Sequence, residues 1–397
     1  MIKQPLDSLD TRSCIAACEA FGAVITAYND SDNMISWQIT GIDGFKASGK
    51  NAKIDVGNSG TTLYLALAVA ALQGEPVIFT GDEQIQKRSA APLLDALAGL
   101  GAQTKSKNGC APITIQGPLK GGKVSLSCPT SQYLSALLIA SPLTPAGTVT
   151  EIEVPLLNEK PYIEMTLSYL KKHKISFEAA PDFSHFIIPG GSSWTAFTDT
   201  VPGDFSSAAF PAAAAAITGG PVSILGLDPE DSQGDKFFFE MLEKMGCDIK
   251  WRRTAGSMAP YCVTVSREGV LRGGIFDLNE TPDLLPAAAV VAAFAEGDTA
   301  LVNVAHARIK ETDRIAVMSS ELAKLGVACT ERPDGLIIHG KGALAPIQNP
   351  VIEGHGDHRI VMAFAAAAAG SPVPVQITTA ECAEVTYPDF FEKFSIF

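Results

Sequence analysis

The run Pro202-Gly-Asp-Phe-Ser-Ser-Ala-Ala-Phe-Pro-Ala-Ala-Ala-Ala-Ala216 joins a polar corner of small residues to an alanine-rich helix. Alanine adds little bulk to any face of a helix, so neighbouring elements can approach such a helix closely from all sides. A second alanine-rich segment, residues 363–369, follows a similar corner at residues 354–359. We therefore expect helices in the interior of each domain and sheets on the outside.

Corners of this kind recur at intervals of about 75 residues, which is long enough for a βαβ-type unit. After each corner we expect an alanine-rich helix, a strand bounded by glycine, a second amphipathic helix and a short strand pair, an alternation that predicts the α/β class. The corners are residues 57–62, 128–132, 202–207, 280–283 and 354–359, and the second helices are expected at 94–101, 163–173, 237–246 and 318–326. Counting back one period from Gly57 predicts that the first repeat is incomplete at the N-terminus, where only its helix at 10–21 remains.

Length and composition limit the class of protein. A chain of 397 residues predicts two domains, and the repeats favour domains at 1–200 and 201–397. The net charge of −13 argues against a nucleic-acid partner. The longest apolar run, residues 63–72, is too short to span a membrane, and no secretory signal opens the chain, so we expect a cytoplasmic protein. The eight cysteines lack metal-type spacing and are expected to be reduced thiols.

The run Arg308-Ile-Lys310-Glu311-Thr-Asp313-Arg314 holds five charged side chains in seven residues. It lies between an expected strand at 299–304 and an expected helix at 315–325, and a helix start attracts anions. On a helix Lys310 and Arg314 would share a face, which like charges avoid unless an anion lies between them. Glu311 offers a carboxylate for proton transfer. The alternative is a solvated helix start with internal ion pairs.

Eight motifs occur in one order along the chain, and they are Gly57-Asn-Ser-Gly-Thr61, the run 130–138, Lys160-Pro-Tyr162, Gly203-Asp-Phe-Ser-Ser207, Gln233-Gly-Asp235, Pro282-Asp283, Lys310-Glu-Thr-Asp-Arg314 and Asp357-His-Arg359. On these motifs the chain, from about Leu6 to Phe394, resembles the 5-enolpyruvylshikimate-3-phosphate (EPSP) synthase family. The resemblance implies a two-domain inside-out α/β barrel built from repeated βαβαββ units. It also implies transfer of the enolpyruvyl group of phosphoenolpyruvate to the 5-hydroxyl of shikimate-3-phosphate, with release of phosphate and without a cofactor.

The resemblance also implies residue roles. Asp283, Glu311 and Lys310 match the catalytic residues, of which Asp283 faces the attacking hydroxyl and Glu311 transfers the proton. The residues that match phosphoenolpyruvate ligands are Gly60, Thr61, Arg88, Gln132, Arg314, His358 and Arg359. Those that match shikimate-3-phosphate ligands are Thr130, Ser131, Gln132, Tyr162, Asp283, His306 and Lys310. Without the resemblance, His358 is better explained as a residue at a helix start. His355 and His358 lie three apart with no further ligands, so no metal is expected.

The chain also departs from the family pattern. A Pro-Gly-Ser-Lys-Ser-type loop is absent because the chain starts after it, in agreement with the repeat count. Tyr64 stands where many members have arginine, His306 replaces an asparagine and Val385 replaces a lysine that contacts phosphoenolpyruvate. Glu159 occupies the place of a serine that helps to bind the acceptor phosphate. A carboxylate is unfavourable beside a dianion, so Glu159 is expected to weaken binding unless it points away.

Three interpretations follow. The first is a shikimate-pathway transferase whose N-terminal segment lies outside this chain. The second is a relative with another acceptor, such as the transferase that acts on UDP-N-acetylglucosamine with a loop cysteine; Cys110 invites the comparison but also suits the start of a strand at 112–116. The third is a non-catalytic anion-binding member. The family is monomeric, but an incomplete first domain exposes a sheet edge, which predicts a dimer or a poorly stable N-terminal domain with reduced activity.

Overall fold

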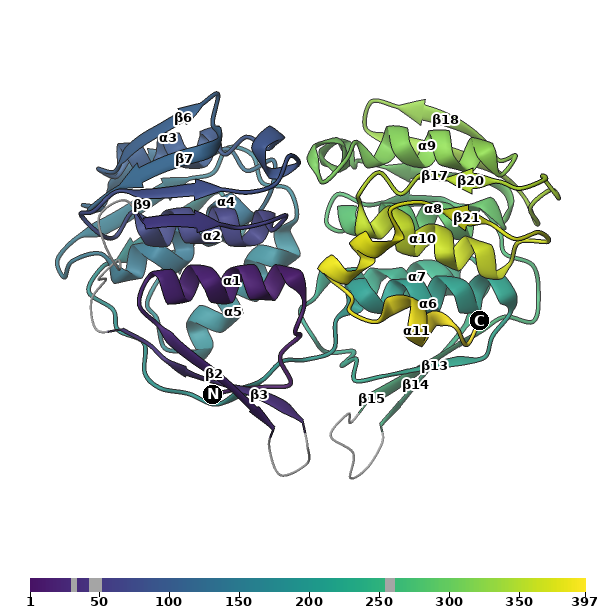
Figure 1. Ribbon diagram of the computed structural model, residues 1–397, viewed down its shortest axis with the longest axis horizontal. Coiled ribbons are helices and arrows are strands. Elements are labelled where there is room, and N and C mark those ends of the chain that lie inside the picture. Colours follow the sequence, from purple (N-terminus) through teal and green to yellow (C-terminus); the bar gives the residue numbers. More distant parts are fainter. Residues whose placement is uncertain (30–33, 43–51, 254–260) are drawn as a thin grey trace. The chain divides into compact units, whose positions relative to one another are not determined.

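The computed structural model describes residues 1–29, 34–42, 52–253 and 261–397 (Figure 1). The chain separates into two compact units, Met1–Val201 and Pro202–Phe397. Each unit has its own cluster of buried apolar side chains. Within the described ranges, no helix combines the length and the apolar character that crossing a bilayer requires.

The N-terminal unit contains three four-stranded sheets. In hydrogen-bonded order they are β12 (Asp199–Thr200), β1 (Ile2–Lys3), β3 (Ile35–Thr40) and β2 (Val24–Asn29); β4 (Ala52–Asp55), β5 (Val77–Thr80), β7 (Cys110–Gln116) and β6 (Gln103–Lys107); and β10 (Glu178–Ala179), β11 (His185–Pro189), β9 (Val149–Glu153) and β8 (Gly122–Ser125). Its helices are α1 (Leu9–Ala20), α2 (Gly60–Ala70), α3 (Ala91–Gly99), α4 (Gln132–Ala140) and α5 (Lys160–Lys172).

The C-terminal unit repeats the plan. Its described sheets are, in order, β13 (Val222–Leu225), β15 (Tyr261–Ser266) and β14 (Asp248–Arg253); β16 (Ile275–Asp277), β17 (Glu296–Val302), β19 (Gly335–Lys341) and β18 (Ala328–Arg332); and the pair β20 (Val351–Ile352) and β21 (Gln376–Ile377). Its helices are α6 (Phe205–Thr218), α7 (Phe237–Lys244), α8 (Leu285–Ala293), α9 (Arg314–Lys324), α10 (His358–Ala369) and α11 (Phe390–Phe394).

Three sheets share one pairing pattern, which confirms the predicted repeats. In each, the first two strands along the chain are parallel neighbours, and the chain between them forms a helix. These pairs are β4 with β5, β8 with β9 and β16 with β17. The second of these strands then pairs antiparallel with the last strand of the unit, and the remaining strand completes the edge. This is the βαβαββ unit. Parallel neighbours require a crossover helix, and the corners and alanine-rich helices of the sequence supply it.

The predicted inside-out arrangement is also confirmed. Every residue of α8 is buried, as are ten residues of α6 and nine of α10. Figure 1 shows these three helices packed together in the C-terminal unit, with strands β13–β15 on one side and β17 and β18 on the other. Small side chains allow this close packing. At Gly370, after α10, an added Cβ would lie 2.2 Å from Ile217 Cγ2 of α6, so the two helix ends approach too closely for any side chain.

The charged run at 308–314 forms the strand-to-helix corner that the sequence predicts. Residues 310–313 do not continue the helix back from Arg314, because α9 begins at Arg314 with Asp313 as its cap, whose carboxylate accepts from Ala316 N at 3.0 Å. The preceding 3₁₀ turn is Ala305–Ile309. Lys310 and Arg314 therefore lie on a corner and do not share a helix face. Asp and other short polar residues favour the cap position over the helix interior, which explains a start at Arg314, one residue before the predicted one.

Candidate active site

The C-terminal unit holds a buried arginine at the centre of a charged corner. Arg314 opens α9 and its side chain is 1% exposed. Its guanidinium donates to Asp357 Oδ2 at 2.9 Å through Nε, to Asp283 Oδ1 at 2.7 Å through Nη1, and to Glu311 Oε2 through Nη2. Nη2 also donates to Asp357 Oδ1 at 3.2 Å. These bonds engage four of the five N–H donors of the guanidinium and align three carboxylates from three corners of the chain.

Asp283 is the carboxylate on which the cations of this corner converge. Lys310 Nζ lies 3.7 Å from Oδ1, and Arg359 Nη2 lies 3.3 Å from Oδ2. Asp283 is thus the anion between Lys310 and Arg314 that their like charges require. Burial raises the pKa of Asp283, but the attraction of Arg359, Lys310 and Arg314 outweighs it and holds that pKa well below its usual range. Asp283 is therefore ionised at neutral pH.

Glu311 and His358 flank the same arginine. The Glu311 side chain is 15% exposed and bonds to Arg314, while His358 begins α10 and is buried. Burial, aided by the charges of Arg359 and Arg314, lowers the pKa of His358 to about 4. His358 is therefore neutral at pH 7 and can accept a proton or a hydrogen bond through one ring nitrogen.

Two carboxylates of this corner received no role from the sequence. Asp357 is fully buried, caps α10 by accepting from Arg359 N at 3.0 Å, and also accepts from Thr312 Oγ1 at 3.0 Å. Asp235 is buried, accepts from Ser206 Oγ, and has a pKa raised to about 6 by burial and by the nearby Asp283. Both belong to quoted motifs, Asp357-His-Arg359 and Gln233-Gly-Asp235. Carboxylates are rarely buried, so the burial of Asp357 and Asp235 marks them as important. The sequence does not show burial, which is why it gave them no role.

The N-terminal unit holds a second group of predicted residues. Gly60 is the first residue of α2, and a Cβ at Gly60 would lie 2.6 Å from Arg88 Nη1. The guanidinium of Arg88 thus lies against the backbone at a helix start. Next to it along α2, Thr61 Oγ1 accepts from Gln132 Nε2 of α4 at 2.8 Å. The structure therefore joins Gly60 to Arg88 and Thr61 to Gln132, four residues predicted to bind phosphoenolpyruvate.

The sequence predicts that Glu159 weakens acceptor binding unless it points away, and it does not point away from the predicted acceptor residues. Its buried carboxylate points at them: Glu159 Oε2 accepts from Thr130 Oγ1 at 3.1 Å, from Ser131 N at 2.9 Å and from Ser131 Oγ at 2.8 Å. The helix start of α4 favours a negative group at this position, which explains why the carboxylate turns inward.

The remaining predicted residues have other surroundings. Tyr162 lies in the first turn of α5, where its amide donates to Glu159 O at 3.1 Å. His306 is buried in the turn before Lys310, with Nε2 lying 3.0 Å from Asn279 O. Cys110 is the first residue of β7, the strand start that the sequence favoured.

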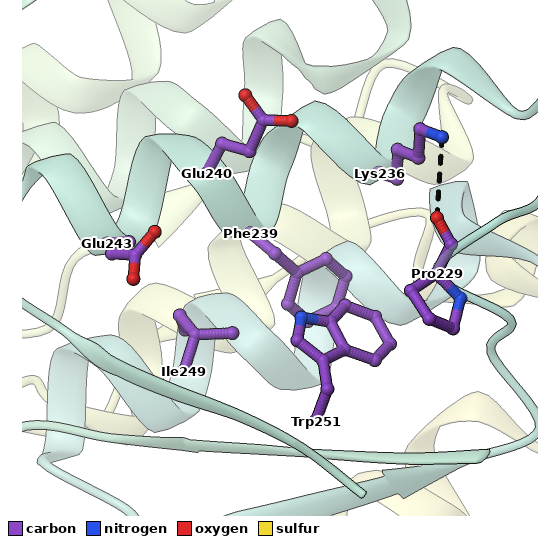
Figure 2. A pocket seen from close by; sticks show the side chains of 7 residues that line it. All are labelled: Pro229, Lys236, Phe239, Glu240, Glu243, Ile249 and Trp251. Atoms are coloured by element: carbon purple, nitrogen blue, oxygen red, sulfur yellow. Dashed lines mark hydrogen bonds between the residues drawn. The ribbon is translucent and has the colours of Figure 1, made fainter. Parts of the chain in front are cut away.

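A separate pocket of about 280 Å³ lies between α7 and β14 (Figure 2). It is lined by Pro229, Lys236, Phe239, Glu240, Glu243, Ile249 and Trp251. The rings of Phe239 and Trp251 meet edge to face with centroids 5.5 Å apart, and Lys236 Nζ lies 3.4 Å from Pro229 O. None of the residues predicted to act in catalysis or substrate binding lines this pocket.

Comparison with known proteins decides the family. The family model described as EPSP synthase (3-phosphoshikimate 1-carboxyvinyltransferase) matches residues 1–394. The chain belongs to the EPSP synthase family. Its relatives include the 3-phosphoshikimate 1-carboxyvinyltransferase of Acetivibrio thermocellus, which is 43% identical over 396 residues covering 99% of this chain and 89% of the relative. The enzyme of the same name from Methanothrix thermoacetophila is 44% identical, with 98% and 88% covered.

Solved structures agree with this EPSP synthase membership. The structure of EPSP synthase from Acinetobacter baumannii superposes with a TM-score of 0.76 at 28% sequence identity, covering 98% of this chain and 88% of that one. The fold class and the family predicted from the motifs are thereby confirmed.

Proposed function

We propose that this member of the EPSP synthase family transfers the enolpyruvyl group of phosphoenolpyruvate to the 5-hydroxyl of shikimate-3-phosphate and releases phosphate. The observation that carries the proposal is the charged corner of the C-terminal unit, where Lys310, Arg314 and Arg359 surround Asp283 and Glu311 lies beside them. The reaction needs both a cationic cradle for phosphoenolpyruvate and carboxylates for proton transfer. The family match supports the choice of substrates.

In this proposal Asp283 takes the proton of the attacking hydroxyl. Its depressed pKa makes it a weak base while three cations face it without substrate. Phosphoenolpyruvate carries a carboxylate and a phosphate, and these groups would pair with Arg359 and Lys310, which are less buried than Arg314. The pKa of Asp283 then rises, because the attraction that lowered it is shared with the ligand. Substrate binding would therefore switch Asp283 into a competent base.

Glu311 is proposed to handle the proton at the methylene carbon of phosphoenolpyruvate. Protonation there makes the neighbouring carbon electrophilic, the acceptor oxygen bonds to that carbon, and loss of phosphate together with the added proton regenerates the double bond. The bond from Arg314 Nη2 holds the Glu311 carboxylate in a fixed orientation. Neutral His358 is proposed to bond to the departing phosphate. Each group would thus meet a separate atom of the reaction.

The proposed ligands in the N-terminal unit complete the assignment. Arg88, beside Gly60, and Gln132, bonded to Thr61, are proposed to contact phosphoenolpyruvate. The proposed acceptor ligands are Thr130, Ser131, Gln132, Tyr162, Asp283, His306 and Lys310. An arginine fork suits a carboxylate or phosphate, and hydroxyl and amide donors suit a phosphate monoester. We further propose that the enzyme works in the cytoplasm, as a step of aromatic amino-acid biosynthesis.

The experiment that tests this function is product identification. The purified chain is incubated with phosphoenolpyruvate and either shikimate-3-phosphate or UDP-N-acetylglucosamine, and the products are followed by phosphorus NMR and mass spectrometry. We expect inorganic phosphate and an enolpyruvyl ether only with shikimate-3-phosphate. Product formed with UDP-N-acetylglucosamine but not with shikimate-3-phosphate would show that the acceptor is the sugar nucleotide. No product with either acceptor would refute the proposal.

A further inference from the structure

Two chain corners meet at Glu159 in the N-terminal unit. The amide of Asn158 donates to Cys128 O at 3.2 Å, and Asn158 Nδ2 donates to Pro129 O at 3.3 Å. These bonds fix the start of α5 beside the start of α4. The Glu159 side chain therefore reaches Thr130 and Ser131 from a rigid base.

The donors around Glu159 form a cradle for a single anionic oxygen. One backbone amide and two hydroxyls, from Thr130 and Ser131, converge on Oε2 at 2.8–3.1 Å. We call these three donors the Thr130–Ser131 cradle. Glu159 as a whole residue is 2% exposed, so its carboxylate fills the cradle and excludes water from it. Hydroxyl and amide donors of this kind equally suit a phosphate oxygen.

The backbone of Glu159 indicates that this placement is costly. Glu159 adopts φ 60° and ψ 44°, in the left-handed region that residues with a Cβ rarely occupy. Such a conformation persists only where surrounding contacts determine it, and it clusters at functional positions. Here the left-handed turn is what directs the carboxylate into the cradle.

We propose that Glu159 is an internal competitor for the anionic group of the acceptor, and that it sets the affinity of this enzyme for shikimate-3-phosphate. This inference rests on the proposed function, which assigns Thr130 and Ser131 to that acceptor. Two anions cannot share three donors at hydrogen-bond distance, because like charges this close repel strongly. The phosphate of the acceptor must therefore displace the Glu159 side chain before it can bind. Glu159 is a specificity-determining residue and takes no part in proton transfer.

The test measures equilibrium binding by calorimetry, which needs no turnover. The variants are Glu159→Ser, which removes the carboxylate, and Glu159→Gln, which keeps the size and removes the charge. We expect the Kd for shikimate-3-phosphate to fall at least about tenfold in Glu159→Ser and by a smaller factor in Glu159→Gln, since removing one charge repulsion has this order of effect. The Kd for shikimate, which lacks the phosphate, should stay within about twofold.

Glu164→Gln is the matched control, because it removes one negative charge from an exposed position of the same helix α5. It should leave both Kd values unchanged. A purely structural Glu159, which only joins the starts of α4 and α5, predicts lower thermal stability and an unchanged or higher Kd for shikimate-3-phosphate, and this result would overturn the proposal. The proposal would also be overturned if the Glu159 variants gained as much affinity for shikimate as for shikimate-3-phosphate.

The outcome is separable from that of the proposed function. Tighter binding of shikimate-3-phosphate by both Glu159 variants supports the inference even where no product forms, whereas lack of product in every variant refutes only the function. If neither Glu159 variant gains affinity for shikimate-3-phosphate, the inference fails even where the wild-type chain turns over.

Discussion

At the scale of single residues, the central feature is a cation placed where water cannot solvate it. Arg314 is 1% exposed and its charge is balanced by Asp283, Glu311 and Asp357. Burial lowers the pKa of Arg314, but the three carboxylates reverse that effect and raise it above the usual value. Such a group is stabilising only while its partners are present, because an unbalanced buried charge costs several kcal/mol.

Asp357, the fully buried partner of Arg314, is therefore expected to stabilise the folded protein. Asp357→Ala should lower the free energy of unfolding by about 3 kcal/mol or more, since breaking a buried pair leaves the other charge uncompensated. Asp298→Asn is the control, because Asp298 forms an exposed pair with His339 and should change stability by less than about 1 kcal/mol. Urea unfolding monitored by circular dichroism measures both. Equal effects of the two substitutions would contradict the buried-pair argument.

The proton-transfer role of Glu311 predicts a kinetic effect. Glu311→Gln should lower kcat by about two orders of magnitude while the KM for phosphoenolpyruvate changes little, as expected of a general acid–base group. Substrate-dependent exchange of the methylene protons should fall with it. Glu331→Gln removes an exposed carboxylate from the same unit and should leave both quantities unchanged. Full exchange activity in Glu311→Gln would remove Glu311 from the proposed step.

Asp235 predicts a pH dependence of stability. Burial raises its folded pKa to about 6, above the ordinary value of 3.8, so between these two pH values the folded state holds a proton that the unfolded state has lost. The contribution of protonated Asp235 to the free energy of unfolding is complete below about pH 4 and is lost as the pH rises through 6. The change amounts to about 3 kcal/mol.

Comparison with a neutral variant isolates this contribution. Between pH 4 and 6.5 Asp235→Asn should become more stable relative to the wild-type chain by about that amount. Thermal melting across this range is the measurement. A difference between the two proteins that does not vary with pH would contradict the raised pKa.

At the scale of elements, the sequence predicted what depends on local periodicity. The predicted helices at 163–173, 237–246 and 10–21 correspond to α5, α7 and α1 with ends shifted by a few residues. Alanine-rich runs predicted the buried helices because side-chain size is a local property. The helix predicted at 315–325 corresponds to α9, but the bonds of Arg314 to distant carboxylates could not be predicted from local periodicity.

The same reasoning applies to the candidate site. The motifs named Asp283, Lys310, Glu311, Arg314 and Arg359, and the structure brings these five together, although their roles remain proposals. The inward turn of Glu159 depends on its backbone conformation and on the neighbouring start of α4, so the residue type alone did not predict it. The structural importance of Asp357 likewise depends on a contact 43 residues away in sequence.

The start of α2 predicts a steric effect on the anion site. In Gly60→Ala the new methyl would lie 2.6 Å from Arg88 Nη1, so the guanidinium must move. The KM for phosphoenolpyruvate should rise by about tenfold, the order expected when one charged contact is displaced, with little change in melting temperature. Gly74→Ala is the control, because no atom lies within 4 Å of a Cβ at Gly74. An unchanged KM in Gly60→Ala would exclude Arg88 as a ligand.

At the scale of the whole molecule, an acidic protein is proposed to bind two anionic substrates. The net charge of −13 repels anions at long range, so binding depends on local groups of cations. In the C-terminal unit, the cations around Asp283 meet this need where α8, α9 and α10 begin. The repeated βαβαββ unit explains the convergence, because each repeat ends a strand at a polar corner and starts a buried helix there.

The most direct test of this account is the rate of phosphate release from phosphoenolpyruvate and shikimate-3-phosphate in the wild-type chain and in Asp283→Asn, at a temperature where both are folded. We predict release by the wild-type chain only when both substrates are present, and a kcat at least about 100-fold lower in the variant, because the base would be lost while the amide keeps the shape of the side chain. Release by Asp283→Asn at the wild-type rate would contradict the account.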